Sequence, residues 1–362
     1  MIGKRLKLAR IGIGLSLREL ETRIGNLVSA QAIGKYERDE MMPSSKTLIA
    51  LAKALGVSES YLIGQGDIQL DGVEFRKKKI TRKKEEAIVE ASVLSRVERY
   101  LEIEDLIDAP SREWDRPREA PFPVHDLKDA EIAADKLRTD WKLGTDPIPN
   151  LAEFLEERGI KVLTLDLPKS VSGLTCWVQR QNRKAIPVIV INVADTGERQ
   201  RFTLVHELGH MVLSVAKDLD EESAAHRFAG AFLMPTSILW VEIGKHRHKL
   251  AIGELLCLKP FFGVSVQALT YRCKDLEIIN PKTFQDLFAE FGRRGWRSPP
   301  YKEPCSVPNE KPCRFERLCY RAIAEGAISL AKGAELLGTT EQELRNQMEP
   351  PPYEDMGKPS VP

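Results

Sequence analysis

The pentapeptide His206-Glu207-Leu208-Gly209-His210 constrains this chain more than any other stretch. It has the form H-E-x-x-H and lies within an apolar run that favours a helix. Residues four apart share one face of a helix, so both imidazoles would point into one site and take two corners of a zinc tetrahedron. Glu207 would project from the same turn, where a carboxylate can act as general base on a metal-bound water. The motif therefore predicts a helix that carries a zinc site.

A catalytic zinc needs a third protein ligand and an open fourth position. Four carboxylates follow the motif within 8 to 12 residues: Asp218, Asp220, Glu221 and Glu222. Glu222 is the best candidate, because it opens an amphipathic helical pattern and would face the motif helix from its first turn. His226 would lie one turn later on the same face. It would either orient a ligand by hydrogen bonding or bind the metal itself.

Composition is that of a globular protein long enough for two or three domains. Of the 362 residues, 42% are hydrophobic and 30% are charged. The formal net charge is +1, so net charge gives no indication that the chain binds a polyanion such as DNA. The local distribution of charge has to be considered instead. No apolar run approaches membrane-spanning length, and the N-terminus lacks an apolar signal core. We therefore expect a cytoplasmic protein with no membrane partner.

Residues 1–66 predict a domain of five short helices. Ser16 with Glu19 three residues on forms a capping box, and Gly25-Asn26 ends that helix. Two helices joined by such a short turn are what a helix-turn-helix requires. Residues 1–65 hold ten Lys/Arg against six Asp/Glu, a modestly basic balance that suits DNA. A bundle that binds only protein is the less favoured alternative.

The second helix of this pair, from Ser29 to Glu37, would enter a major groove by its N-terminal end. Gln31 can pair bidentately with adenine, with Ala30 beside it and Lys35 one turn later. Basic side chains elsewhere in the domain would contact phosphates. They are Arg10, Arg18, Arg38 and Lys46.

This segment resembles the XRE (Cro/C1-type) helix-turn-helix family. The matching motifs include Leu6-Lys7-Leu8-Ala9-Arg10, Ser16-Leu17-Arg18-Glu19-Leu20 and Leu51-Ala52-Lys53-Ala54-Leu55-Gly56-Val57. The resemblance implies base reading by positions 30, 31 and 35. The chain departs from the family at Glu21, where a small residue is usual, and at Arg38-Asp39-Glu40, where a glycine usually follows the helix. Modules of this kind usually read two half-sites, so we expect a homodimer on double-stranded operator DNA.

Residues 67–123 predict a basic helical linker that ends in a Pro-rich loop. Arg76 to Lys84 contains seven Lys/Arg and no acid. This run is either an arm that contacts the DNA backbone or the solvated start of a linker helix. Apolar residues recur at helical spacing from Glu85 to Ile107. Four prolines between residues 109 and 123 then mark a loop and a domain boundary.

Residues 124–285 predict the metal-binding domain. Three segments show the alternating or continuously apolar pattern of β-strands: Ile160–Leu165, Gly173–Val178 and Ile186–Asn192. The third is the most apolar, so we expect it to be the central strand. The motif helix should begin near Thr196. A small sheet against this helix would place an edge strand beside the metal. Minimal zinc peptidases hold an extended peptide along such an edge by strand addition.

Residues 126–280 resemble the ImmA/IrrE family of zinc metallopeptidases. The resemblance rests on Arg199-Gln200-Arg201-Phe202-Thr203-Leu204-Val205-His206-Glu207-Leu208-Gly209-His210 and on Glu222-x-x-Ala225-x-x-Phe228-Ala229-x-x-Phe232-Leu233-Met234-Pro235. It implies Zn²⁺ held by His206, His210 and Glu222, with Glu207 as the base. His226 stands where the family usually has Asn or Asp, which predicts a rearranged set of hydrogen bonds around the metal ligands. Tyr271 and Arg272 are weak candidates for binding the oxyanion.

Residues 286–348 predict a helical extension with a packing or dimerisation role, and 349–362 predict a disordered tail. The six cysteines include no C-x-x-C pair, so most are expected to be free thiols near packed regions. Cys305, Cys313 and Cys319 cluster, but their spacing does not fit a zinc knuckle or ribbon. A second metal site there is the less favoured alternative.

Together these patterns predict an α+β, mostly helical protein: a five-helix DNA-binding domain plus a minimal zincin-like metallopeptidase domain with a small β-sheet. The combination resembles bacterial and phage stress-response regulators. The first hypothesis is a transcriptional regulator that carries a zinc metallo-endopeptidase, gluzincin-like in its ligands, which cleaves an XRE-type repressor, an antitoxin-like partner or itself. The second is a DNA-binding repressor whose metallopeptidase-like domain is inactive and only senses a ligand or metal. The third is a protease that uses the DNA module only for localisation or dimerisation.

Overall fold

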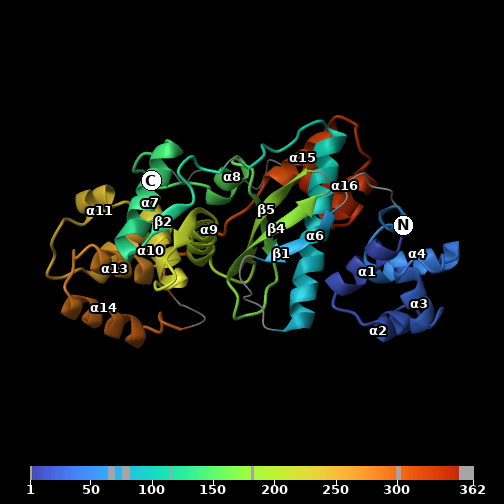
Figure 1. Cartoon of the computed structure of the whole chain (residues 1–362), viewed down its shortest axis with the longest axis horizontal. Coiled ribbons are helices and arrows are strands. Elements are labelled where there is room, and N and C mark those ends of the chain that lie inside the picture. The colour runs from blue at the N-terminus through green and yellow to red at the C-terminus, as the bar shows by residue number, and fades with distance from the viewer. Residues whose placement is uncertain are drawn as a thin grey trace, which may run out of the picture. The chain divides into compact units, whose positions relative to one another are not determined.

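The computed structural model divides the chain into two compact units, one of which is assembled from three separate segments. The described residues are 2–63, 70–75, 82–114, 116–180, 183–298 and 303–349. Unit 1 comprises Met1–Leu70, Glu86–Ser111 and Cys313–Pro362, and unit 2 comprises Asp71–Glu85 and Arg112–Pro312. Helices dominate and the sheets are small, so the predicted α+β, mostly helical class is confirmed (Figure 1).

The N-terminal part of unit 1 is a bundle of five short helices, as the sequence predicts. They are α1 (Gly3–Gly12), α2 (Leu17–Arg23), α3 (Ala30–Glu37), α4 (Ser45–Leu55) and α5 (Glu59–Ile63). The predicted capping box is present, because Ser16 Oγ accepts a hydrogen bond from the Glu19 N–H and the Glu19 carboxylate accepts one from the Ser16 N–H. Leu6, Leu20 and Ile33 are fully buried in the centre of the bundle. These contacts fix α2 and α3 in the helix-turn-helix arrangement.

The rest of unit 1 is a long helix on which the C-terminal helices pack. These elements are α6 (Lys83–Leu106), α15 (Arg314–Ala324), α16 (Leu330–Leu337) and α17 (Glu341–Met348). Tyr100 and Ile103 of α6 share a buried cluster with Leu318 and Leu336. The segment 286–348, predicted as one extension, therefore contributes to both units, and its last helices have a packing role. Most of the basic run (residues 76–81) and residues 350–362 of the tail lie outside the described residues.

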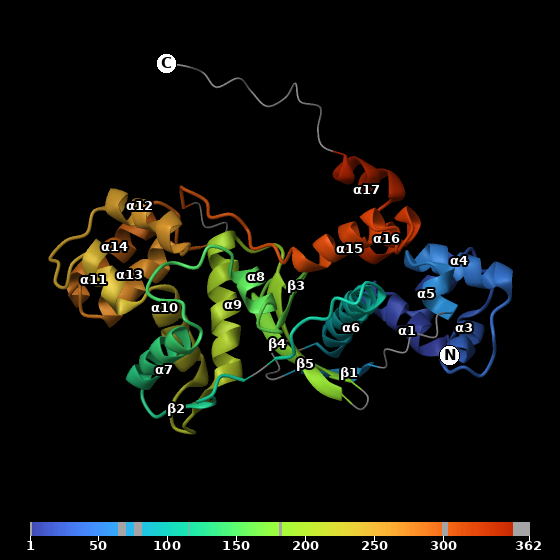
Figure 2. The same cartoon turned by 90° about the horizontal axis from the view of Figure 1, so that it is seen from above.

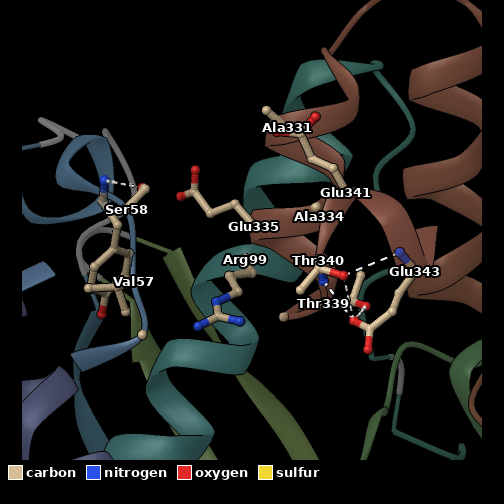
Figure 3. Close-up of a pocket in the computed structure, with 13 residues that line it drawn as sticks. Val57, Ser58, Arg99, Ala331, Ala334, Glu335, Thr339, Thr340, Glu341 and Glu343 are labelled. Atoms are coloured by element: carbon tan, nitrogen blue, oxygen red, sulfur yellow. Dashed lines mark hydrogen bonds between the residues drawn. The ribbon is translucent and has the colours of Figure 1, made fainter. Parts of the chain in front are cut away.

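Unit 1 contains a cavity of about 500 Å³ next to α6 (Figure 3). Arg99 of α6 projects into it, between the loop at Val57-Ser58 and the helices α16 and α17. Some of the polar groups on its wall stabilise local turns. Ser58 Oγ accepts the Tyr61 N–H, and Thr340 and Glu343 form the capping box of α17.

The main sheet of unit 2 has the strand order β1-β4-β5-β3. Its strands are β1 (Leu70–Phe75), β3 (Lys161–Leu165), β4 (Gly173–Arg180) and β5 (Arg183–Asn192). β5 pairs parallel with β3 and antiparallel with β4. It is interior and buried from Ile186 to Asn192, so the most apolar strand is central, as predicted. β1 adds a fourth strand that the sequence pattern did not reveal.

One helix, α9 (Gly197–Val212), lies between this sheet and most of the other helices of unit 2, whereas α8 (Leu151–Glu156) lies beside both α9 and β3 (Figure 2). The others are α7 (Leu127–Asp140), α10 (Glu221–Leu233), α11 (Thr236–Glu242), α12 (Ile252–Phe262), α13 (Val266–Asp275) and α14 (Pro281–Arg293). A two-stranded parallel sheet joins β2 (Phe122–Val124) to β6 (Leu213–Val215). β2 lies at the edge of the segment predicted as a Pro-rich loop, because its backbone pairing with β6 outweighs the local proline signal.

An extended segment, residues 303–312, crosses the N-terminal half of α9. Glu310 accepts hydrogen bonds from the Arg201 guanidinium and the Ala152 N–H, and both side chains of this ion pair are almost fully buried. Glu303 and Glu198 both bind the ammonium group of Lys259, whose side chain is 0% exposed. A Cβ atom at Gly197 would come within 2.2 Å of the Pro308 carbonyl oxygen. This segment therefore holds the N-terminal half of α9, the helix that carries the H-E-x-x-H motif, in place.

Among the described residues no single helix is long and apolar enough to cross a membrane, and one bent pair, α12 with α13, passes that test on length and composition alone.

Candidate metal centre

The H-E-x-x-H motif lies in the second half of α9, which is buried on all sides. The helix begins immediately after Thr196, as predicted, and the side chains of His206, Glu207 and His210 are 6%, 1% and 3% exposed. Two imidazoles and a carboxylate buried on one helix require polar partners, because unpaired buried polar groups are costly. The partners come from β4 and α10.

The glycine within the motif allows α10 to approach α9 closely. A Cβ atom at Gly209 would lie 3.1 Å from the Phe228 ring and 3.5 Å from Ala225 Cα. Asp220 caps α10 by accepting the Ser223 N–H, so the helix begins at Glu221 and places Glu222 in its first turn. The sequence-predicted third ligand is therefore brought to the two histidines by helix packing and helix capping together.

Three side chains converge at the spacing of a metal coordination sphere. His206 Nε2 lies 3.1 Å from His210 Nε2, and Glu222 oxygens lie 3.2 Å from His206 Nε2 and 3.5 Å from His210 Nε2. Ligand atoms around a tetrahedral zinc are separated by about 3.3 Å, because each zinc–ligand bond is about 2.0 Å long. His206, His210 and Glu222 form the group of potential ligands found among the described residues. The donor set, two imidazoles and one carboxylate, fits Zn²⁺.

A fourth side chain, Glu221, orients one of the histidines. Its Oε1 lies 3.0 Å from His210 Nδ1. With the Nδ1 proton donated to this carboxylate, the lone pair of His210 Nε2 faces the other ligands. Glu221 appeared among the sequence candidates only as a possible ligand. Its position next to the helix cap gives it the role of hydrogen-bond acceptor for His210.

The predicted base, Glu207, is held by β4. Thr175 Oγ1 donates hydrogen bonds to Glu207 Oε2 at 3.0 Å and to the Glu207 carbonyl oxygen at 3.2 Å. The approach of β4 depends on Gly173, where a Cβ atom would come within 2.4 Å of Thr203 Cγ2 and 2.8 Å of the Val190 carbonyl oxygen. Thr175 was missed by the sequence analysis, because only the pairing of β4 beside α9 reveals its neighbour.

His226 lies beside the three potential ligands without joining them. Its ring centroid is 4.6 Å from that of His206 and 5.6 Å from that of Phe202, and its side chain is exposed. Its ring is tilted by 52° relative to that of His206, and it lies one turn after Glu222 as the spacing predicts.

Other reactive groups near the site have structural surroundings. Burial, and secondarily the negative charge of Glu207, raises the pKa of the Cys176 thiol on β4, so this cysteine stays protonated. The Arg272 guanidinium is buried and binds Glu131, the Met234 carbonyl oxygen and Thr236. Tyr271 packs its ring against Phe284 and Phe288. These contacts pack Arg272 and Tyr271 against their neighbours, and their binding of an oxyanion stays a prediction.

In the helix-turn-helix, the side chains proposed to meet DNA are mostly exposed. Gln31 and Lys35 lie one turn apart on the open face of α3, Ala30 is half-buried beside them, and Arg18 is exposed on α2. The Arg38 side chain is 58% exposed and pairs with Glu40. Arg10 differs from the expectation that it is available for phosphates. Two of its three side-chain nitrogens donate to the Glu37 carboxylate, and the third donates to the Leu15 carbonyl oxygen.

Comparison with known proteins assigns these two regions to families. Residues 155–274 match the IrrE N-terminal-like domain, and residues 6–62 match a helix-turn-helix family. The chain therefore joins an XRE-type helix-turn-helix, a DNA-binding class of module, to an ImmA/IrrE-like domain. A curated relative is an SPbeta prophage-derived uncharacterized HTH-type transcriptional regulator, YonR, of Bacillus subtilis (strain 168). It is 37% identical over 71 residues, which cover 20% of this chain and 64% of the relative. No solved structure matches the chain.

Proposed function

We propose that this chain is a transcriptional regulator whose ImmA/IrrE-like domain is a zinc-dependent endopeptidase that cleaves a protein partner, such as an XRE-type repressor. The observation that carries the proposal is the convergence of His206, His210 and Glu222 at 3.1–3.5 Å beside a buried Glu207. A purely structural zinc site would use four protein ligands. Three ligands with an adjacent oriented carboxylate are the arrangement of a hydrolytic site.

His206, His210 and Glu222 would hold the Zn²⁺, which would supply Lewis-acid activation of a water molecule and of a peptide carbonyl. The chain's own residues supply the proton transfers and the geometry. Glu207 takes a proton from the attacking water at one carboxylate oxygen and returns it to the leaving amine. Thr175 keeps the Glu207 carboxylate in one orientation, and Glu221 does the same for the His210 ring. The second half of α9 is buried, whereas the side chains of Glu222 and Glu221 are 39% and 42% exposed, so solvent can reach the site from α10.

The helix-turn-helix provides the second part of the proposal. Gln31, Ala30 and Lys35 would contact base edges in a major groove, with Arg18 and Arg38 on phosphates. A homodimer would let two copies read two half-sites of an operator. A peptidase tethered to a DNA reader acts on few substrates, so we propose a regulatory role in a stress or phage-related response.

The test compares the wild-type chain with Glu207→Gln. Both proteins are purified, their zinc content is measured, and each is incubated with XRE-type repressors encoded beside the gene. We expect equal zinc content, cleavage by the wild type at a single region of one repressor, and no cleavage by Glu207→Gln. If both proteins bind zinc and neither cleaves any partner, the peptidase proposal is wrong. The sensor hypothesis, a DNA-binding repressor with an inactive metal domain, then takes its place.

A further inference from the structure

The strand beside the candidate site, β4, has both of its hydrogen-bonding edges occupied. One edge pairs antiparallel with β5 in the register Thr175↔Ile189. The other edge is hydrogen-bonded to β1, the six-residue strand Leu70–Phe75 (Figure 1). An unpaired edge would be a template for any extended polypeptide. In this structure β1 fills that position.

β4 is also the strand that contacts the proposed base. Thr175 Oγ1 donates to Glu207 Oε2, and a Cβ atom at Gly173 would lie 3.7 Å from Glu207 Cγ. Because the opposite edge of β4 is taken by β5, a peptide that adds to the sheet next to Glu207 must use the edge where β1 lies. Strand addition relies on main-chain hydrogen bonds, so one extended segment can substitute for another.

β1 comes from the linker between the DNA-binding bundle and α6. Residues 71–85 group with unit 2, whereas the segments on both sides, up to Leu70 and from Glu86, group with unit 1. The linker therefore contributes one strand, β1, to the sheet of unit 2. A strand of six residues contributes few main-chain hydrogen bonds, which keeps its pairing energy small. Its tether raises its effective concentration to the millimolar range, which favours it over a free peptide.

We propose that β1 is a resident strand in the peptide-binding edge of β4, and that it must leave before a substrate polypeptide can bind there. The proposed peptidase function is the reason for regarding this edge of β4 as a substrate-binding edge, and the sheet order shows that β1 pairs with it. A substrate polypeptide would therefore compete with β1 for pairing with β4. It also connects the peptidase site to the linker that begins at the DNA-binding bundle.

The test measures strand exchange without cleavage, in chains that carry Glu207→Gln. The first variant replaces residues 70–75 by Gly-Ser-Gly-Ser-Gly-Ser, and the matched control makes the same replacement at residues 76–81, which leaves β1 intact. Hydrogen–deuterium exchange is followed at the amides of Gly173–Arg180. We expect exchange of the β4 amides to rise about tenfold or more in the first variant and to stay unchanged in the control.

A synthetic peptide with the sequence of residues 68–77 is then added to each protein. We expect it to restore protection of β4 in the first variant, at micromolar to millimolar concentrations, and to leave the parent chain and the control unaffected. Equal exchange of β4 in the parent chain and the first variant would overturn the inference. Equal uptake of the peptide by both would overturn it as well.

Two further readings separate this inference from the proposed function. Loss of protection at the α9 amides would mean that the first variant disturbs the fold beyond β1. The experiment would then use the point variant Gly72→Pro, because proline perturbs strand pairing with a smaller change in sequence. With Glu207 intact, we expect the variant lacking β1 to cleave a partner faster at low partner concentration. Peptide uptake with no cleavage of any partner would contradict the peptidase while leaving the resident strand in place.

Discussion

Thr175 Oγ1 on β4 donates a hydrogen bond to Glu207 Oε2 on α9 across 3.0 Å. The two residues are 32 positions apart in the chain, and both are buried. This contact joins the sheet to the proposed base. A general base must be held within hydrogen-bonding reach of its proton, so we expect the contact to affect catalysis.

The first prediction is that Thr175→Val slows peptide cleavage by about 10- to 150-fold, equivalent to the loss of one hydrogen bond to a charged group of about 1.5–3 kcal/mol. Valine has nearly the volume of threonine, so the fold should persist. Thr175→Ser, which keeps the hydroxyl group, should stay within about threefold of the wild type. The measurement is kcat on a cleaved repressor, with zinc content as the control. Equal losses in both variants would show that the hydroxyl group has no role in orienting Glu207.

The second prediction distinguishes the two adjacent carboxylates of α10. Glu222→Gln removes one of three proposed ligands, and we expect zinc affinity to fall by more than about 100-fold. Glu221→Gln removes only the acceptor for His210 Nδ1, and we expect a fall of about 10- to 100-fold. The exposed Asp218→Asn serves as the control and should leave affinity unchanged. Competition with a chromophoric chelator measures all three. The reverse order of the first two would exchange the roles assigned to Glu221 and Glu222.

The third prediction concerns the segment that crosses α9. Glu310→Ala leaves the buried Arg201 guanidinium and the Ala152 N–H without this acceptor, and we expect about 3–5 kcal/mol of destabilisation. Glu119→Ala is the matched control, because the Lys136–Glu119 ion pair is at least half exposed and contributes at most about 1 kcal/mol. Urea unfolding followed by tryptophan fluorescence checks both. A shift for Glu310→Ala no larger than that of the control would mean that the segment is not an anchor.

The fourth prediction separates sequence reading from phosphate binding in the helix-turn-helix. We expect Gln31→Ala to weaken binding to the selected operator by about 1–3 kcal/mol while leaving binding to scrambled DNA unchanged. Lys46→Ala should weaken binding to both DNAs alike and reduce the salt dependence by about one unit of slope. Fluorescence anisotropy at several salt concentrations measures these effects. An unaltered operator preference in Gln31→Ala would favour the hypothesis that the module only localises or dimerises a protease.

The sequence by itself determined the features that depend on neighbours within a few turns of chain. The capping box at Ser16, the start of α9 after Thr196 and the alignment of His206 with His210 follow from capping and from the 3.6-residue period of a helix. The central position of β5 also followed, because a strand buried on both faces must be apolar throughout. The family resemblances rested on the same local motifs, and comparison confirmed both families.

Only the tertiary structure decided which distant residues meet these motifs. Thr175 reaches Glu207 because β4 pairs beside α9, and Glu221 reaches His210 because Gly209 lets α10 approach. Likewise, no local pattern marks Leu70–Phe75 as a strand on the edge of β4, since an edge strand is specified by the partner that it pairs with. Contacts between residues far apart in the sequence depend on how whole helices and strands pack, which no short stretch of sequence specifies. The sequence therefore predicted which groups could bind the metal, and the fold decided which residues orient them and what occupies the adjoining edge.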